Sequence, residues 1–197
     1  MNGKTGIDSS DSDLLLKGRK HLTIVAILLS ASMALGMGNY ESTQTSKRDP
    51  ALEKLDCFVG DWKSDAKVFP GKFGPGGQAS GTTHYHCAVG NNWLIFDSAF
   101  SLPGMVTYEV HGLVAYDQKE GKYVAYAVNN LAPHAIEYRG EWKDENSLIF
   151  TSVTKSSVGK WSRVVYEKLP DGKIRFSSEE SSDGAAFTRY FESTLSR

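Results

Sequence analysis

The chain has 197 residues, of which 40% are hydrophobic and 23% are charged, and its formal net charge is −1. These values are typical of a soluble globular protein with one domain. Lysine and arginine form no cluster beyond the N-terminal region, and the near-zero net charge argues against a nucleic-acid-binding surface.

The N-terminal region has the pattern of an export signal. Lys17, Arg19 and Lys20 form a basic segment, an apolar run follows, and Ser32-x-Ala34 is a small-x-small cleavage site. We predict a signal peptide over residues 1–34 and an exported protein, periplasmic or secreted. A retained anchor is the alternative, but residues 22–37 fall short of the roughly 20 apolar residues that a membrane span needs.

The remainder of the chain divides into a tether and one domain. Residues 35–50 are rich in Ser, Thr, Asn and Gln and predict a flexible tether, followed by a folded domain over residues 51–197. Residues 50–55 predict a short helix. From Trp62 onward, apolar and polar residues alternate with period two between turn signals, which indicates strands.

We predict about ten short strands joined by tight turns. Their residues are 62–68, 79–89, 93–100, 108–116, 123–128, 136–142, 148–153, 161–169, 174–181 and 187–195. Sequential strands joined in this way predict an all-β fold, an antiparallel up-and-down β-barrel with a short N-terminal helix. A β-sandwich is the alternative.

Two segments are expected to close the barrel. Gly60 and Trp62 stand at the entry to the first strand, where a glycine permits close backbone approach and an indole can plug an open end. Residues 70–77 are dominated by Pro and Gly, with Phe69 and Phe73 beside or within them. They predict a long loop suited to a lid.

The chain has only two cysteines, Cys57 and Cys87, both in the part expected to be exported. In an oxidising compartment they predict one disulfide. Two unpaired buried thiols are the alternative. No CxxC redox or zinc pattern occurs.

Aromatic residues recur along the predicted barrel walls and predict an internal site for a small apolar or amphipathic ligand. The residues expected to line this site are Tyr85, Trp93, Tyr108, Tyr126, Tyr138, Trp142 and Tyr166. No cofactor and no particular oligomeric state is predicted.

His84 and His86 are weak candidates for a metal site, because residues two apart on a strand share one face. A third ligand would have to come from Asp97, Glu109 or His111. The alternative is that both histidines are ordinary wall residues, and we predict no metal site.

Catalytic patterns are mostly absent. Residues 77–81 place their serine one position late for a nucleophile elbow, and the glycine-rich loop lacks a following Lys-Ser/Thr. The sequence therefore favours a binding protein. The alternatives are an isomerase or hydrolase with a His/Tyr pair inside the barrel, and a structural or partner-binding module with a filled barrel.

The chain resembles the calycin superfamily of lipocalin-like barrels in its short helix, its Gly60-x-Trp62 start and its strand count. It also resembles a family of exported bacterial proteins catalogued only as a domain of unknown function. The matching motifs are residues 55–62, the 70–77 loop, Gly90-Asn91-Asn92-Trp93-Leu94, residues 112–117 and Tyr138-Arg139-Gly140-Glu141-Trp142. This resemblance implies a barrel fold and no established activity.

Two features of better-known barrels bear on this chain. Lipocalins place a late arginine over the first tryptophan, and Arg189 is expected to take that role here, with Arg175 and Arg197 as competitors. Haem-binding nitrobindin-like barrels use a histidine near the C-terminus. This chain has no histidine after His134, so that haem site does not carry over.

Overall fold

A computed structural model describes residues 48–71, 74–105 and 107–197. The predicted signal peptide and most of the predicted tether lie outside the described residues. Residues 48–50, assigned to the tether, belong to the folded domain: Arg48 pairs with Asp56 at 2.6 Å, and Pro50 begins a helix. Within the described ranges, no helix is long and apolar enough to cross a membrane.

The N-terminal helical segment consists of helix α2 (Pro50–Glu53) and a 3-10 helix, η1 (Asp56–Phe58). The Asp49 side chain caps α2 by accepting a hydrogen bond from the Ala51 amide at 2.7 Å. Pro50 stands in the first turn, where its missing N–H removes no helical hydrogen bond. This confirms the predicted short helix.

Ten strands follow, close to their predicted bounds. They are β1 (Gly60–Val68), β2 (Gly77–Ala88), β3 (Trp93–Ser101), β4 (Tyr108–Asp117), β5 (Lys122–Asn129), β6 (Ala132–Trp142), β7 (Ser147–Ser152), β8 (Trp161–Lys168), β9 (Ile174–Ser181) and β10 (Thr188–Ser196).

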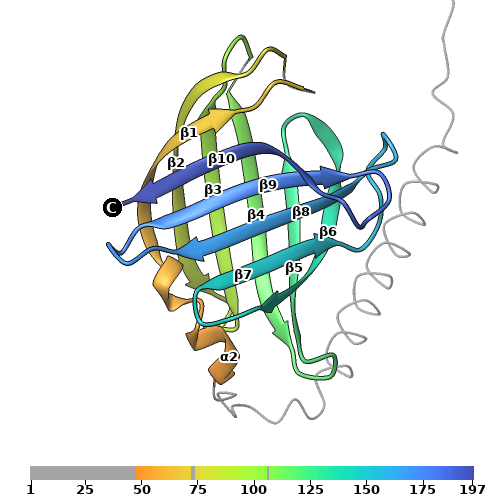
Figure 1. Cartoon of the computed structure of the whole chain (residues 1–197). Helices are drawn as coiled ribbons and strands as arrows, with labels where there is room; N and C mark the ends of the chain where they lie inside the picture. The colour runs from red at the N-terminus through yellow and green to blue at the C-terminus, as the bar shows by residue number, and fades with distance from the viewer. Residues whose placement is uncertain (1–47, 72–73, 106) are drawn as a thin grey trace, which may run out of the picture. The chain divides into compact units, whose positions relative to one another are not determined.

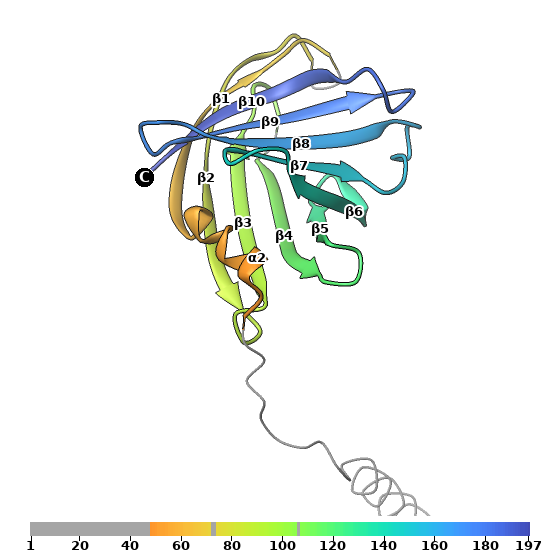
Figure 2. The same cartoon turned by 60° about the horizontal axis from the view of Figure 1, so that its bottom comes forward.

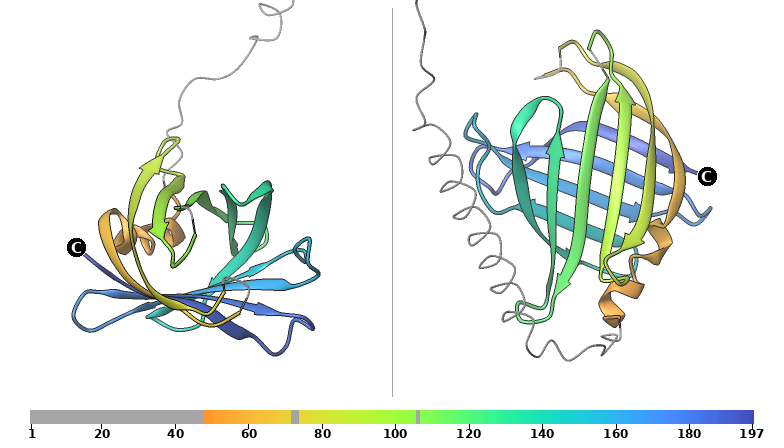
Figure 3. Two further views of the ribbon diagram at one scale, coloured as in Figure 1. Left: turned by 90° about the horizontal axis from the view of Figure 1, so that it is seen from above. Right: turned by 180° about the vertical axis from the view of Figure 1, so that it is seen from behind.

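The sheet closes on itself. Each strand pairs antiparallel with its neighbours in sequence, and β1 also pairs with β10, through contacts such as Lys63 with Ser196. This confirms the up-and-down barrel and excludes the sandwich. Because both sides of β1 are hydrogen-bonded, the sheet has no free edge there. Figure 1 shows β7–β10 crossing steeply in front of β2–β5, and the rear view in Figure 3 shows β2–β4 side by side.

Strand β6 begins four residues earlier than predicted and contains Pro133. A proline inside a strand argues against a central position, because it cannot donate to the ladder. Here β7 pairs only with residues 138–142 of β6, so Pro133 lies where β7 has already ended. The missing N–H therefore costs no hydrogen bond to β7.

Alternation along the strands separates an inner from an outer face. In β1, Trp62, Ser64, Ala66 and Val68 are buried, and the residues between them are exposed. The larger buried cluster gathers side chains from the helical segment and from most strands, including Leu55 and Phe58. Figure 2 shows the helical segment at the end of the barrel where β1 begins. Since its apolar side chains join the barrel core, it plugs that end.

A tryptophan and an arginine seal the plugged end. The Trp62 indole N–H donates to the Phe58 carbonyl at 2.6 Å, and the Arg197 guanidinium lies 4.6 Å from the Trp62 ring centroid. Arg197 Nη2 also donates to the carbonyls of Cys57 at 3.1 Å and Val59 at 3.0 Å. Gly60 has φ +122°, a conformation that other residues rarely adopt.

The expectation for Arg189 was wrong, and the register explains why. Lys63 pairs with Ser196, so the end of β10 lies beside Trp62, whereas Arg189 is at the start of β10 near the other end of the barrel. Arg189 pairs instead with Glu192 and, at 3.5 Å, with Glu179. The competitor Arg197 takes the predicted role.

The predicted disulfide is absent, because Cys57 and Cys87 are both free thiols. Cys57 lies in η1 and its Sγ donates to the Lys54 carbonyl at 3.4 Å, whereas the Cys87 Sγ contacts Arg48 Nη2 at 3.5 Å. Burial raises the pKa of the Cys57 thiol. Each sulfur therefore has a local partner of its own.

We expect Arg197→Ala to lower the free energy of unfolding by about 1 kcal/mol, because it removes two charge-assisted hydrogen bonds and a stacking contact at a partly exposed site. Arg175→Ala is the matched control, since Arg175 makes a solvent-exposed ion pair with Glu167 and should lose no more than about 0.5 kcal/mol. Urea unfolding measures both. Equal losses would contradict the assignment of Arg197 as the closing residue.

Candidate ligand-binding cavity

A cavity of about 140 Å³ lies inside the barrel. All strands from β2 to β10 contribute to its walls, so the closed sheet surrounds it. Aromatic rings supply much of the lining. They are Tyr85, Phe96, Phe100, Tyr108, Tyr138, Phe150, Tyr166, Phe176, Tyr190 and Phe191. The interior is therefore not completely filled by side chains.

The rings contact one another in a continuous series. Phe58 of the plug meets Tyr166 edge-on at 5.1 Å between centroids, and Tyr166 meets Phe176 at 5.1 Å. Phe176 then contacts Phe191 at 5.8 Å, and Phe191 contacts Phe100 at 5.2 Å. Such tilted and edge-to-face pairs stabilise the wall beyond simple area burial. The cavity is therefore bounded by mutually supported rings.

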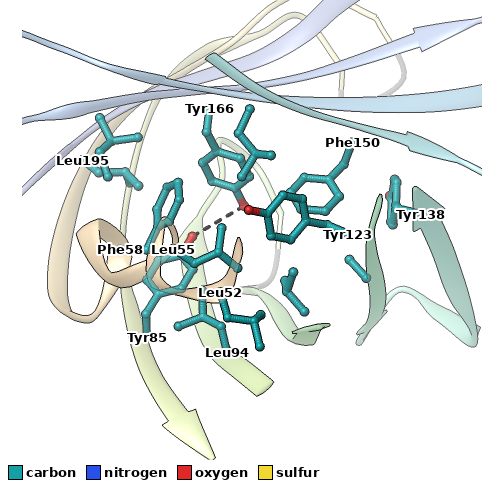
Figure 4. Close-up of a cluster of buried hydrophobic side chains, with 14 of the residues drawn as sticks. Leu52, Leu55, Phe58, Tyr85, Leu94, Tyr123, Tyr138, Phe150, Tyr166 and Leu195 are labelled. Carbon is teal, nitrogen blue, oxygen red and sulfur yellow. Dashed lines mark hydrogen bonds between the residues drawn. The ribbon is translucent and has the colours of Figure 1, made fainter. Parts of the chain in front are cut away.

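Hydroxyl groups are the main polar groups on this apolar surface. The Tyr85 hydroxyl donates to the Tyr166 hydroxyl at 3.5 Å, as the dashed line in Figure 4 shows. Thr83 and Ser98 share a hydrogen bond at 2.9 Å. Tyr138 bonds to Ser162, and Tyr190 bonds to Ser178.

Burial keeps the cavity tyrosines neutral. It raises the pKa of Tyr166 and of Tyr190 to about 12. The pKa values of Tyr85, Tyr108 and Tyr138 are also raised, again mainly because burial penalises the phenolate. At neutral pH each phenol is therefore an uncharged hydrogen-bonding group.

The cavity lining carries no charge. Among the described residues, only Phe, Tyr, Leu, Val, Ile, Ala, Thr, Ser and Asn border it, and no Asp, Glu, Lys, Arg or His does. A buried ionised group without a partner costs several kcal/mol in proteins. The electrostatic environment therefore suits an uncharged molecule.

At the end of the barrel opposite α2, a residue outside the predicted lid loop lines the cavity. Leu102, just after β3, lines the cavity and belongs to a buried cluster with Phe100 and Phe191. The predicted lid was residues 70–77, but none of the described residues of that loop lines the cavity. Among the described residues outside the strands, Leu102 of the β3–β4 connection is the one that lines the cavity.

A β-bulge adds one aromatic residue to the interior. The register between β10 and β9 shifts between Arg189 and Phe191, so Tyr190 is the extra residue. Both Tyr190 and Phe191 line the cavity, although neighbours on a regular strand face opposite sides. This irregularity escaped the alternation pattern.

Five of the seven predicted ligand-binding residues border the cavity: Tyr85, Tyr108, Tyr126, Tyr138 and Tyr166. Tyr126 also borders an outer groove together with Trp93, which is absent from the cavity lining. Trp142 donates its indole N–H to the Tyr123 hydroxyl at 3.1 Å, with the Lys168 ammonium 4.5 Å from its ring centroid.

Sequence reasoning missed the phenylalanines of the lining, Phe96, Phe100, Phe150, Phe176 and Phe191. The signal that could have found them is the phase of alternation. Phe96 lies two residues from Leu94 and Phe176 lies two from Ile174, and both Leu94 and Ile174 are buried. The sequence-based prediction emphasised tyrosines because of their hydroxyls. The phase of alternation instead places Phe and Tyr side chains together on the inner face.

The described histidines do not face the interior of the barrel. His84 is exposed between the buried Thr83 and Tyr85, and no histidine of residues 48–71, 74–105 and 107–197 borders the cavity. The predicted His/Tyr pair of an enzyme inside the barrel is therefore not brought together. Among the described residues, no group of three or more His, Cys, Asp or Glu side chains is arranged to hold a metal ion.

The fold and the cavity define a closed antiparallel barrel with an apolar, uncharged interior. The model of the family described as "Protein of unknown function (DUF1579)" matches residues 49–197, so the chain belongs to this family. No curated protein matches the sequence.

Among solved structures, the chain is similar to the crystal structure of Rv2717c from M. tuberculosis. The TM-score is 0.56 and the identity 10%, and the match covers 77% of this chain and 99% of that one. At this identity the similarity supports the fold alone.

We expect the free energy of unfolding to fall between about pH 10 and pH 12. Unfolded tyrosines ionise near pH 10, whereas Tyr166 and Tyr190 keep their protons until about pH 12 in the folded state. The folded state therefore binds more protons in this window, and the stability present below pH ~10 is lost as the pH rises.

Urea unfolding across this pH range measures the effect, and phenolate absorbance follows the ionisation directly. Tyr166→Phe should make the fall shallower, since it removes one of the groups responsible. Complete ionisation of the folded protein near pH 10, with no loss of stability, would contradict the predicted burial of the phenols.

Proposed function

We propose that the barrel binds a small, uncharged molecule with an apolar, preferably aromatic, body. The observation that carries this proposal is the combination of an internal cavity with a lining of aromatic rings and no charged residue. Apolar pockets with a few convergent polar groups are the usual form of small-molecule sites.

The volume sets the size of the buried part of the ligand. An engineered apolar cavity of about 150 Å³ stays dry and binds benzene. The cavity here measures about 140 Å³. One six-membered ring therefore fits, and a longer molecule would need part of its length outside the cavity.

The lining also indicates the ligand's chemistry. An ionised carboxylate would be buried without a cationic partner, at a cost of several kcal/mol. The Tyr166 hydroxyl, which accepts a hydrogen bond from Tyr85, can instead donate its own proton to a carbonyl, ester or hydroxyl oxygen. Of the apolar and amphipathic ligands that the sequence predicts, the proposal therefore keeps only the uncharged ones.

The proposal includes an exported protein, periplasmic or secreted, on the strength of the signal pattern in residues 1–34. In that setting the barrel would sequester or carry a poorly soluble molecule. An enzyme with a histidine base receives no support from the cavity, because none of the histidines that the structure describes borders it.

Methyl benzoate and benzoate test the proposal, because they share one ring and differ mainly in charge. We expect methyl benzoate to bind and benzoate to bind at least about 100-fold more weakly, since the anion loses several kcal/mol on burial. Isothermal titration of the full chain, supported by ligand-observed NMR, measures both.

A pair of variants places the binding inside the barrel. Ala127→Phe fills the cavity and should abolish binding, because Ala127 is part of its lining. Ala115→Phe is the matched control on the outer wall, where Ala115 borders a separate groove, and it should bind normally. Equal affinity for ester and anion, or unchanged binding by Ala127→Phe, would overturn the proposal.

A further inference from the structure

The outer face of β2 presents two histidines side by side. His84 and His86 alternate with the inward-facing Thr83 and Tyr85, and their rings are stacked, with centroids 5.2 Å apart and an interplanar angle of 29°. The pair is held by the β-strand geometry rather than by a loop. Its imidazoles therefore stay neighbours on a rigid wall.

A carboxylate orients the first imidazole. Asp61 stands opposite His84 in the β1–β2 ladder, and its Oδ1 lies 2.6 Å from His84 Nδ1. When a carboxylate accepts a hydrogen bond from Nδ1, the ring presents Nε2 as its unprotonated, electron-donating nitrogen. Metal-binding histidines commonly have this outer partner, which fixes the tautomer and raises the basicity of the ligand.

In the second imidazole, Nε2 is the nitrogen available to a ligand by elimination. His86 Nδ1 is buried and has no hydrogen-bond partner in the described part of the chain. The side chain as a whole is only half-buried, so its other nitrogen, Nε2, is the one left for a ligand at the surface.

We propose that His84 and His86 together bind one divalent transition-metal ion through their Nε2 atoms. Imidazole nitrogens bind zinc at about 2.0–2.1 Å, and two rings that share one ion then have centroids roughly 5 Å apart. The observed centroid separation of 5.2 Å matches this value.

Water completes the coordination sphere. The residues expected to supply a third protein ligand are engaged elsewhere or not gathered: Asp97 Oδ1 lies 2.7 Å from His111 Nδ1, and no three-residue group forms among the described side chains. The site is therefore an open one with two protein ligands, which suits imidazole-preferring ions such as nickel, copper and zinc.

The groove beside His84, a depression of about 800 Å³, is mixed in charge. Asp61, Asp97 and Glu109 border it, and so do Lys63 and Arg197. The carboxylate in direct contact with the histidine pair is Asp61, and its negative charge favours a cation bound there. This inference is independent of the proposed function, because neither His84 nor His86 borders the cavity.

Nickel(II) titration of the full chain, without an affinity tag, tests the site by calorimetry. We expect one ion per chain, and a rise in the thermal unfolding midpoint with nickel present. His84→Ala and His86→Ala should each weaken binding at least about 10-fold, because each removes one of two protein ligands. Asp61→Asn should weaken it by about 10-fold through loss of the carboxylate partner.

His111→Ala is the matched control, since His111 is also an exposed histidine with a carboxylate partner on this wall, and it should bind nickel as the unmodified chain does. Unfolding midpoints without nickel check that each variant is folded. Unchanged binding in the His84 and His86 variants, loss of binding in His111→Ala, or no binding at millimolar nickel would each overturn the proposal.

Discussion

The pairing of β1 with β10 is the constraint on which the rest of the domain depends. Without it, ten strands would form an open sheet with two unpaired edges. With it, each residue faces either a closed interior or solvent, and a shift of one residue would exchange the two. Trp62 and Arg197 hold this closure at the plugged end, where β1 begins and β10 ends. The interior cavity exists because that seam is shut.

Much of the fold was predictable because alternation and turn chemistry are local signals. The ten strands of the barrel were all predicted. Gly60 and Trp62 lie at the start of the first of them, β1. The predictions failed where they depended on how strands distant in sequence are aligned with one another. Arg189 and Arg197 cannot be distinguished until β10 is aligned against β1, and the bulge at Tyr190 has no signature in the alternation. The disulfide was inferred from compartment and count, which say nothing of where each sulfur points.

The cavity survives because small residues stand beneath large rings. A Cβ added to Gly112 would lie 2.2 Å from Phe96 Cζ, and one added to Gly140 would lie 2.3 Å from Phe150 Cε1. Each ring therefore lies against bare backbone of the neighbouring strand, rather than projecting across the barrel. Aromatic rings that cover strand glycines in this way complete the packing of the barrel wall without filling the centre of the barrel. Gly112 and Gly140 belong to the motifs at residues 112–117 and 138–142. The packing of the rings explains why glycine occupies these two positions.

One strand shows how closure assigns two chemistries to a single sequence. Along β2, Thr83 and Tyr85 contribute a hydroxyl-bearing, neutral surface to the interior, whereas His84 and His86 contribute imidazoles to the outer wall. The interior excludes ions because an unpaired charge there costs several kcal/mol, whereas the outer wall can hold a cation that remains partly hydrated. The same period of two that forms the strand thus separates the proposed apolar-ligand site from the proposed metal site by one layer of backbone. The two proposed sites use different side chains of one strand, so neither competes with the other.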